Sequence, residues 1–262
     1  MDQPVCLAIG GLDPSGGAGI IADVKTFRAF GCFAAAAVTS ITFQNTTGVF
    51  GVLDQTAATL RGQIEPILTD LPVAAVKTGM LPTRELVAET ARLIAGEGLS
   101  NLIIDPVIRS TSGSDLINGD ALSAMIELLF PLADLVTPNI AEAERIAGMA
   151  ITSERSVRRA GPIIRSMGAK NVLIKGGHLG SRTRNGTALD LLFTENGIEV
   201  FEAPAVDIAE THGTGCAMAS AIAANLALGR DLIASVESAK EFVTHAIRSA
   251  HVLGAGSFPI NI

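Results

Sequence analysis

The sequence contains no tyrosine and no tryptophan, and its aromatic content of 4% is entirely phenylalanine. A flat ligand therefore has to pack on phenylalanine, methionine or valine. The three cysteines, Cys6, Cys32 and Cys216, are odd in number and widely spaced, which argues against a disulfide framework or a zinc site of neighbouring thiols. We expect reduced thiols and a cytoplasmic protein.

Long charged and long apolar runs are also missing. The net charge is −7, and no run of lysine or arginine forms the basic stripe that nucleic acid or an anionic membrane requires. No apolar stretch approaches the roughly 18 residues of a membrane span, and the N-terminus lacks the basic start of a signal peptide. We therefore expect no nucleic-acid partner and no membrane partner. Neither glycine-rich stretch is followed by lysine and then serine or threonine, which excludes a Walker A loop.

The residues that are abundant indicate a single domain over 1–262, because 48% hydrophobic content in 262 residues suits one large core. Apolar runs alternate with segments of helical spacing, which predicts an α/β fold with a mainly parallel central sheet flanked by helices on both faces. The expected strands are 5–10, 34–40, 74–79, 101–105, 133–138 and 171–175. The expected helices are 20–30, 56–68, 83–95, 121–129, 156–167, 216–226 and 232–252. Residues 188–194 and 198–204 flank "ENG", which predicts an antiparallel hairpin at the sheet edge.

Polar and glycine residues follow each expected parallel strand. Ligands of open α/β sheets bind beyond the carboxyl ends of the strands, so we expect a site assembled from these loops. The loops read "GGLDPSGGAG", "SITFQN", "KTGM", "DPVIRSTSG", "TPNIAE" and "KGGH".

The stretch "THGTGC" precedes a helix of small residues. Gly213, Thr214, Gly215 and Cys216 are expected to form an anion hole, since glycine leaves backbone N–H groups open and a helix N-terminus attracts negative charge. The same position lowers the pKa of a thiol, which makes Cys216 the cysteine placed to react. The alternative is a structural turn with a small buried cysteine.

Seven motifs in order give the chain an almost end-to-end resemblance to the hydroxymethylpyrimidine and phosphomethylpyrimidine kinases of thiamine biosynthesis. They are "GLDPSGGAGIIAD", "QNTTGV", "KTGML", "DPV", "TPNIAEA", "KGGH" and "THGTGC". The resemblance implies a ribokinase-like fold. It also implies phosphorylation of 4-amino-5-hydroxymethyl-2-methylpyrimidine and then of its monophosphate, with ATP and Mg²⁺.

The resemblance assigns five residues to the pyrimidine. Gln44 is expected to read the aminopyrimidine edge, because its amide both accepts and donates hydrogen bonds. Met80 and Val107 would hold the ring faces, although ordinary core packing explains most such residues. Asp23 would accept a hydrogen bond near the ring, and its alternative is a first-turn carboxylate that stabilises a helix. Gly11 would let the ligand lie against backbone.

The resemblance also assigns residues to the nucleotide-binding part of the site. Asp105 and Glu142 would hold Mg²⁺ largely through water, which suits the oxygen ligands and retained waters that Mg²⁺ prefers. Asn139, Lys175 and Gly176 would bind ATP, with Lys175 as a point charge near the phosphates. Asp105 could instead end a strand, and Glu142 could stabilise the first turn of a helix. His178 is expected to be structural.

Cys216 stands where most sugar kinases of the superfamily have a catalytic aspartate. We expect it to act as the general base for the first phosphorylation, if part of it is thiolate. The second nucleophile is a phosphate monoester that is already mostly dianionic, because its second pKa is about 6. A cysteine, unlike a fixed carboxylate, could therefore serve both steps.

Two departures from the family pattern stand in "DPVIRSTSG". Ile108 replaces a methionine and Thr111 replaces a lysine, which leaves the second phosphorylation in question; Arg109 is the candidate replacement for that positive charge. Two other functions stay open, a pyridoxal or pyridoxine kinase and a catalytically silent pyrimidine sensor. The resemblance also suggests a homodimer.

Overall fold

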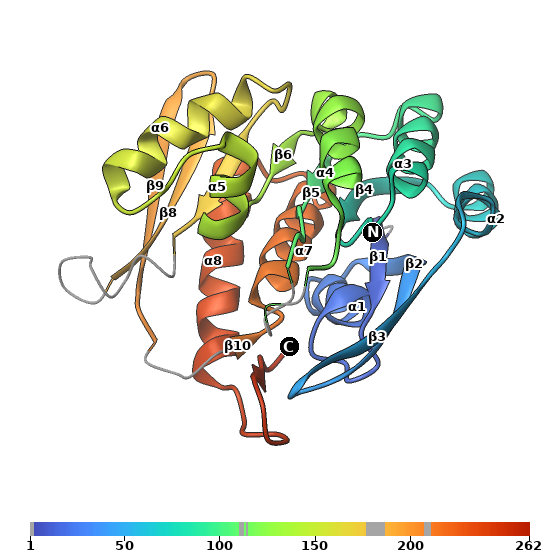
Figure 1. The fold of residues 1–262 in the computed structure, drawn as a ribbon, viewed down its shortest axis with the longest axis horizontal. Coiled ribbons are helices and arrows are strands. Elements are labelled where there is room, and N and C mark those ends of the chain that lie inside the picture. Colours follow the sequence, from blue (N-terminus) through green and yellow to red (C-terminus); the bar gives the residue numbers. More distant parts are fainter. Residues whose placement is uncertain (1–2, 110–112, 114, 177–186, 207–210) are drawn as a thin grey trace.

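The chain has an α/β fold in a computed structural model, with helices on both faces of a central sheet (Figure 1). The structure describes residues 3–109, 113, 115–176, 187–206 and 211–262. The residues Thr111 and His178, to which the sequence analysis gave roles, lie outside these ranges. Within the described ranges, none of the helices combines the length and the apolar character of a membrane span.

Nine strands of the described chain form one sheet in the order β3-β2-β1-β4-β5-β6-β7-β8-β9. Neighbours from β2 to β7 run parallel, whereas β3, β8 and β9 are antiparallel to their neighbours. The strands are β1 (Val5–Leu12), β2 (Phe33–Asn45), β3 (Gly48–Asp54), β4 (Val73–Thr78), β5 (Leu102–Ile104), β6 (Leu135–Val136), β7 (Val172–Lys175), β8 (Thr187–Thr194) and β9 (Gly197–Pro204). Two short strands, β10 (Thr211–His212) and β11 (Phe258–Pro259), pair separately.

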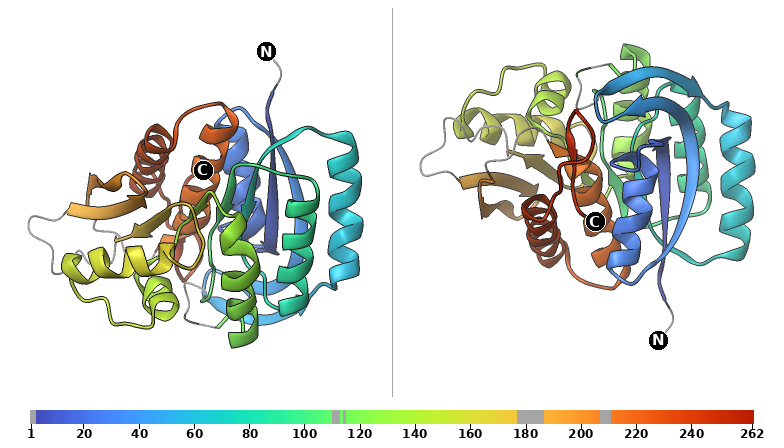
Figure 2. Two further views of the ribbon diagram at one scale, coloured as in Figure 1. Left: turned by 90° about the horizontal axis from the view of Figure 1, so that it is seen from above. Right: turned by 90° about the horizontal axis from the view of Figure 1, so that it is seen from below.

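Two hydrophobic cores lie on opposite faces of the sheet, under two groups of helices (Figure 2). The first core takes side chains from α2 (Ala57–Asp70), α3 (Arg84–Gly96), α4 (Gly119–Ala124), α5 (Ile140–Ala147) and α6 (Glu154–Arg165). A π-helical turn (Met125–Leu129) and a 3₁₀ turn (Phe130–Leu132) extend α4. The second core takes side chains from α1 (Gly19–Ala29), α7 (Thr214–Ala227) and α8 (Leu232–Arg248).

Local sequence explains where most of these helices begin. The side chains of Thr56, Thr83, Asn139, Ser153 and Asp231 each accept a hydrogen bond from a backbone N–H in the first turn of α2, α3, α5, α6 and α8. In contrast, no side chain of the described residues caps α7, which begins after a glycine. The first N–H groups of α7 therefore have no partner within the helix.

The predicted α/β fold and its edge hairpin, β8 with β9, are confirmed. Three expectations were wrong in detail. Residues 41–45 are not a loop, because β2 extends to Asn45 and pairs with β3, so the site loop predicted there is a second antiparallel hairpin. Residues 140–142 begin α5, whose capping box the motif "TPNIAE" already contained. The last helix ends at Arg248, four residues earlier than predicted, ahead of the glycines at 254 and 256.

Candidate active site

The first turn of α7 supplies a row of open backbone N–H groups. Gly213 precedes the helix with a φ of 93°, a left-handed conformation that favours glycine. Thr214, Gly215 and Cys216 are the first three helical residues, so their N–H groups have no intrahelical acceptor. The helix dipole adds partial positive charge at this end. This turn has the geometry of the predicted anion hole.

The two glycine-rich stretches of the sequence pack against each other here. A Cβ on Gly213 would overlap the carbonyl oxygen of Gly17, and a Cβ on Gly17 would lie 2.7 Å from the His212 ring. Only glycine at both positions allows this approach. The loop that follows β1 and the loop that precedes α7 therefore form one surface at the carboxyl edge of the sheet.

Asp13, which the sequence analysis did not single out, fixes this junction. Its carboxylate accepts hydrogen bonds from the backbone N–H and hydroxyl of Ser15, from the Ala18 N–H, and lies 3.0 Å from Nε2 of His212. Gln44 also hydrogen-bonds to it. Burial opposes ionisation of Asp13, but the hydrogen bonds from His212 and Ser15 outweigh burial and hold its pKa well below the usual range.

Four of the residues expected to hold a pyrimidine lie at the ends of four neighbouring strands, β2, β1, β4 and β5. The sulfur of Met80 would be 3.1 Å from a Cβ on Gly11, so these two positions are in close contact. Gln44 lies near the end of β2 and reaches Asp13, two residues after Gly11. Val107 follows β5, the next strand after the one that leads into Met80.

Asp23, which was expected to accept a hydrogen bond near the pyrimidine, lies on α1 and pairs with Lys77. Both of its carboxylate oxygens lie 2.8 Å from Nζ of Lys77, and one accepts a hydrogen bond from Ser220. Asp23 is fully buried and Lys77 is 1% exposed. In this structure the Asp23 carboxylate therefore faces a buried ammonium group, and its oxygens are already occupied.

Cys216 is partly exposed at the start of α7. The pKa of this thiol is raised, so the expectation that the helix N-terminus lowers it is wrong. Burial of the sulfur raises the pKa of the thiol to about 11, while the charge of Lys77 and a hydrogen bond from the Gly19 backbone act in the opposite direction. Cys216 is therefore a neutral thiol near neutral pH.

The expected nucleotide residues meet next to the same helix turn. Nζ of Lys175 lies 2.8 Å from the Asp105 carboxylate. A Cβ on Gly215 would be 3.2 Å from that ammonium and 3.6 Å from Asp105 Oδ2. Gly215 thus lets the N-terminus of α7 approach the ion pair closely. Gly176 follows, and its N–H donates to the carboxylate of Asp190.

Asn139 and Glu142 form the capping box of α5. The Asn139 side chain accepts from the Glu142 N–H at 2.9 Å, and Glu142 accepts from the Asn139 N–H at 2.8 Å. The helix-stabilising alternative is therefore realised for Glu142. Burial raises the pKa of Glu142 to about 7, with Lys175 opposing and Asp105 reinforcing the shift. The three charged side chains share one electrostatic cluster.

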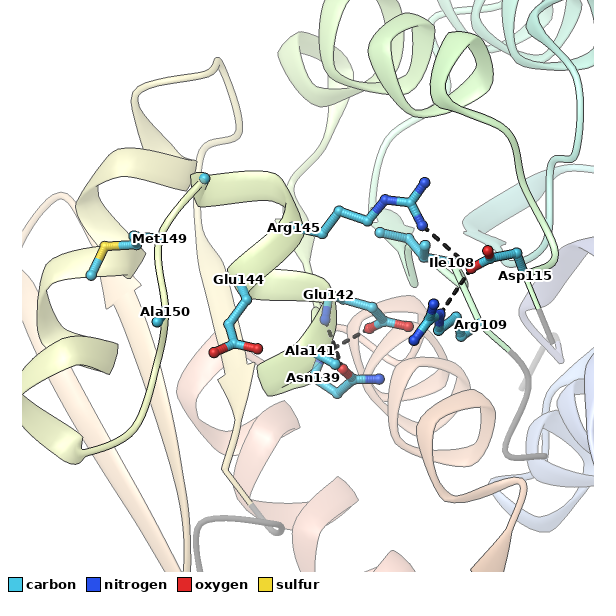
Figure 3. A pocket seen from close by; sticks show the side chains of 11 residues that line it. Ile108, Arg109, Asp115, Asn139, Ala141, Glu142, Glu144, Arg145, Met149 and Ala150 are labelled. Atoms are coloured by element: carbon cyan, nitrogen blue, oxygen red, sulfur yellow. Dashed lines mark hydrogen bonds and ion pairs between the residues drawn. The ribbon is translucent and has the colours of Figure 1, made fainter. Parts of the chain in front are cut away.

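A pocket of about 780 Å³ opens beside this cluster (Figure 3). Asn139 and Glu142 lie on one side of it. Across from them Asp115 accepts from Arg109 at 2.8 Å and lies 3.5 Å from Arg145. Arg109 and Arg145 bring two guanidinium groups to the pocket, while Asp115, Glu142 and Glu144 bring three carboxylates, so its lining carries charges of both signs. The guanidinium groups are the part of this lining that suits a nucleotide phosphate.

The carboxylates of Asp105 and Glu142 fit a magnesium ion that arrives with a nucleotide. The described residues contain no group of three or more histidine, cysteine, aspartate or glutamate side chains able to hold a metal alone. Mg²⁺ is commonly held by one or two carboxylates together with substrate phosphates and waters. Two buried carboxylates match that requirement, and one of them, Asp105, lies beside the first turn of α7.

The C-terminal segment, which the sequence left without a role, closes one side of the site. Its strand β11 pairs with β10, directly before Gly213. Farther along, the Ser257 N–H donates to the carbonyl of Thr46, in the turn between β2 and β3. This segment ties the β2–β3 hairpin to the approach of α7.

Sequence reasoning missed Asp13, Lys77, His212 and Ser220. The first three stand inside quoted motifs, "GLDPSGG", "KTGM" and "THGTGC". The available signal was a charged or polar residue close to glycines for Asp13 and His212, and a charged residue near the end of an apolar strand for Lys77. Ser220 carries no such signal, because one serine in a helix of small residues is ordinary.

Comparison with known proteins gives the site its context. A family described as phosphomethylpyrimidine kinase matches residues 13–261. The thiamine biosynthesis bifunctional protein ThiED of Geobacter sulfurreducens is 42% identical over 97% of the chain, which spans 51% of that protein. A hydroxymethylpyrimidine/phosphomethylpyrimidine kinase of Haemophilus influenzae is 38% identical over 97% of this chain and 95% of its own.

Solved structures of two enzymes share the fold. A phosphomethylpyrimidine kinase of Clostridium difficile is 39% identical with a TM-score of 0.81, covering 94% of this chain and 100% of that one. The ADP complex of a Bacillus subtilis pyridoxal kinase is 33% identical with a TM-score of 0.90, covering 99% of this chain and 97% of that one.

Proposed function

Because the chain belongs to the phosphomethylpyrimidine kinase family, we propose that the site around Cys216 phosphorylates two substrates in turn. The family relationship makes the protein an ATP-dependent phosphotransferase of thiamine biosynthesis. The first substrate is 4-amino-5-hydroxymethyl-2-methylpyrimidine and the second is its monophosphate. The observation that carries the proposal is the contact of Gly215 with Lys175 and Asp105, which joins the open N–H groups of α7 to the charged cluster.

The pyrimidine lies between Gln44, Met80 and Val107 in this proposal. The Gln44 amide reads the amine and a ring nitrogen, and its bond with Asp13 fixes its orientation. The Met80 thioether and Val107 contact the ring faces, which compensates for the absence of tyrosine and tryptophan. This arrangement presents the hydroxymethyl group toward Cys216. Gly11 allows the ring to approach backbone beside Met80.

In the first transfer the hydroxymethyl oxygen attacks the γ-phosphorus, the bond from that phosphorus to the ADP oxygen breaks, and Cys216 takes the proton. Phosphoryl transfer depends mainly on in-line positioning and charge stabilisation, so a small thiolate population is sufficient. The N–H groups of Gly213 to Cys216 stabilise the charge on the transferring group. Lys175 adds a positive charge beside them.

In the second transfer the monophosphate oxygen attacks, and no proton has to leave a nucleophile that is mostly dianionic already. A neutral thiol does not repel this substrate. With a pKa of about 11, Cys216 is a neutral thiol, which suits the second step better than a charged carboxylate would.

Asp105 and Glu142 would hold Mg²⁺ on the nucleotide, and a bound Mg²⁺ neutralises phosphate charge and orients the phosphates. Asn139 positions Glu142 through the capping box. Gly176 contributes backbone at the nucleotide side, with its N–H already paired to Asp190. Arg109 and Arg145 line the adjoining pocket and offer the positive charge that the family lysine would otherwise supply.

A pyridoxal kinase is the second candidate, and one observation favours it. The B. subtilis pyridoxal kinase shares the fold at a TM-score of 0.90 over 99% of this chain. The relatives at 38% identity and above over 97% of the chain are named for thiamine biosynthesis or for the pyrimidine, so we place the pyrimidine first.

The test is ATP consumption by the purified protein with the pyrimidine alcohol, its monophosphate and pyridoxal, each over a range of concentrations. We expect kcat/KM for the alcohol to exceed that for pyridoxal by at least tenfold, a discrimination of about 1.4 kcal/mol. Equal or greater activity on pyridoxal would reverse the order of the two candidates. A protein that binds the pyrimidine and consumes no ATP would be a sensor.

We further propose a single kinase domain, a homodimer and a cytoplasmic location. The family match from 13 to 261 supports one domain. Exposed apolar side chains on β2 and β3, among them Phe43, Phe50 and Leu53, support a contact between two copies. Cys6 and Cys32 interact as free thiols, which is the state expected in a reducing compartment.

A further inference from the structure

The ion pair of Lys77 and Asp23 is the most deeply buried charged pair close to Cys216. Both Asp23 oxygens contact the ammonium at 2.8 Å, and Ser220 donates to Asp23 at 2.7 Å. Replacing such a pair by apolar side chains is often neutral or stabilising. Stability alone is therefore a poor explanation for a full lysine charge inside this core.

The geometry directs this charge toward the site. The ammonium of Lys77 would lie 3.0 Å from a Cβ on Gly79, so it reaches the carboxyl end of β4, where the ligand loops begin. Ser220 stands four residues after Cys216 on α7, and residues at that spacing share one helix face. Cys216 and Ser220, which donates to the Asp23 carboxylate, therefore lie on the same face of α7.

Several groups surround the Cys216 sulfur. Lys77 on β4 favours a negative sulfur, whereas Asp23 on α1 and Asp105 after β5 oppose it, and the backbone N–H of Gly19 donates to it. Lys175 on β7 also attracts a negative sulfur, but its ammonium is paired with Asp105. If Lys77 were neutral, Asp23 would therefore face the sulfur without a compensating charge. The charge of Lys77 therefore opposes the repulsion that would keep a proton on Cys216.

We propose that Lys77 is a positioning residue for phosphoryl transfer, held by Asp23 and Ser220 so that its buried positive charge lets Cys216 accept the proton of the substrate alcohol. This inference rests on the proposed function. The oxygen–phosphorus bond forms, the γ-phosphorus bond to ADP breaks, and the alcohol proton moves to the sulfur and later to solvent. The second transfer releases no proton, so it depends less on Lys77.

Two variants separate this role from a structural one. Asp23→Asn keeps the lysine charge and removes its carboxylate partner, so the sulfur becomes the nearest available counterion. We expect alkylation of Cys216 by iodoacetamide at pH 7.5, followed by mass spectrometry, to rise about tenfold for each unit by which the thiol pKa falls. Asp23→Asn/Lys77→Met removes both charges with similar side-chain volumes. Its alkylation rate is expected to be at least tenfold below that of Asp23→Asn.

Activities give a second readout. Relative to Asp23→Asn, the transfer to the alcohol in Asp23→Asn/Lys77→Met is expected to fall about 10- to 1000-fold, since an opposite charge nearby shifts a pKa by roughly one to three units. Transfer to the monophosphate is expected to change little. The ratio of the kcat for the alcohol to the kcat for the monophosphate should therefore be at least tenfold lower in the double variant than in Asp23→Asn. A structural role would lower both together.

A matched control exists elsewhere in the fold. Lys240 on α8 and Asp190 on β8 form another buried pair, at 2.6 Å. Asp190→Asn/Lys240→Met removes a pair of the same chemistry, and we expect it to leave the alkylation rate of Cys216 within about threefold of wild type, because Cys216 is not among its contacts in the described residues.

Equal alkylation rates in Asp23→Asn and Asp23→Asn/Lys77→Met would overturn the inference, as would an equal loss of both transfers. If thermal unfolding shows that the double variant does not fold, the alkylation rate of Asp23→Asn is compared with that of the wild type. The role of Lys77 is then refuted if Asp23→Asn reacts no faster. A wild-type protein inactive on both pyrimidines defeats the proposed function instead. If the wild type is active but the variants change neither the alkylation rate of Cys216 nor the ratio of the two transfers, only this inference is refuted.

Discussion

Gly213→Ala is the substitution that most directly tests how α7 is placed. Gly213 has a φ of 93°, and an added Cβ would overlap the Gly17 carbonyl oxygen. The left-handed backbone alone costs about 1–2 kcal/mol for a residue other than glycine. Overpacking adds about 1–3 kcal/mol. We therefore expect the free energy of unfolding to fall by about 2–5 kcal/mol in total.

The matched control is Gly31→Ala. Gly31 also has a positive φ, of 80°, but nothing lies within 4 Å of its added Cβ. It should lose only the backbone contribution of about 1–2 kcal/mol. Because its surroundings are open, kcat should stay within about threefold of wild type. The two variants thus share the strain and differ in the contact with the Gly17 loop.

The assays are urea unfolding and steady-state kinetics with both pyrimidine substrates. Displacing Gly213 moves the N–H groups of α7, and removing one donor from an oxyanion hole costs about 10²- to 10³-fold in kcat. We expect at least a hundredfold loss for both transfers in Gly213→Ala. The argument that Gly213 holds the anion hole in place would be refuted if Gly213→Ala had the same free energy of unfolding as Gly31→Ala and a kcat within threefold of it.

Three further predictions concern the thiol, the pocket and the surface. Alkylation of Cys216 in the ligand-free protein should accelerate about tenfold per pH unit from pH 7 to 9, because its pKa is about 11; a plateau below pH 9 would contradict that value. Arg109→Ala/Arg145→Ala should raise KM for ATP about tenfold or more with kcat little changed, since hydrogen bonds to charged groups contribute about 1.5–3 kcal/mol; an unchanged KM in steady-state kinetics removes these arginines from the nucleotide site. Phe50→Glu on β3 should convert a dimer to a monomer in light scattering, and a dimer that persists locates the contact elsewhere.

Periodicity in the sequence was sufficient to predict the parallel sheet and most of the helices that cover it, because strands buried on both faces leave continuous apolar runs. It was insufficient for β3. The turn "NTTG" has the composition of a loop, and the pairing of Gln44 with Val49 depends on a bulge that no local pattern shows. The hairpin also places Gln44 on a strand, where its amide reaches Asp13.

The candidate site was predictable where a motif carries its own chemistry, as in "GTGC" and in the capping box of Asn139 and Glu142. It was not predictable where partners are distant in sequence. Asp23 meets Lys77 across 54 residues, and Asp13 meets His212 across 199. The sign of the Cys216 pKa shift depended on burial, which raises the pKa more than Lys77 and the Gly19 N–H lower it, and burial cannot be known from spacing.

The measurement that tests the account most directly is the pair of turnover numbers of Cys216→Asp, with the pyrimidine alcohol and with its monophosphate. The account predicts that transfer to the alcohol survives better, because a carboxylate can still take a proton, whereas the fixed charge repels the incoming phosphate dianion. The ratio of monophosphate to alcohol turnover should fall at least tenfold, an energy of about 1.4 kcal/mol. A ratio that stays constant or rises would contradict the claim that a neutral thiol lets one site perform both transfers.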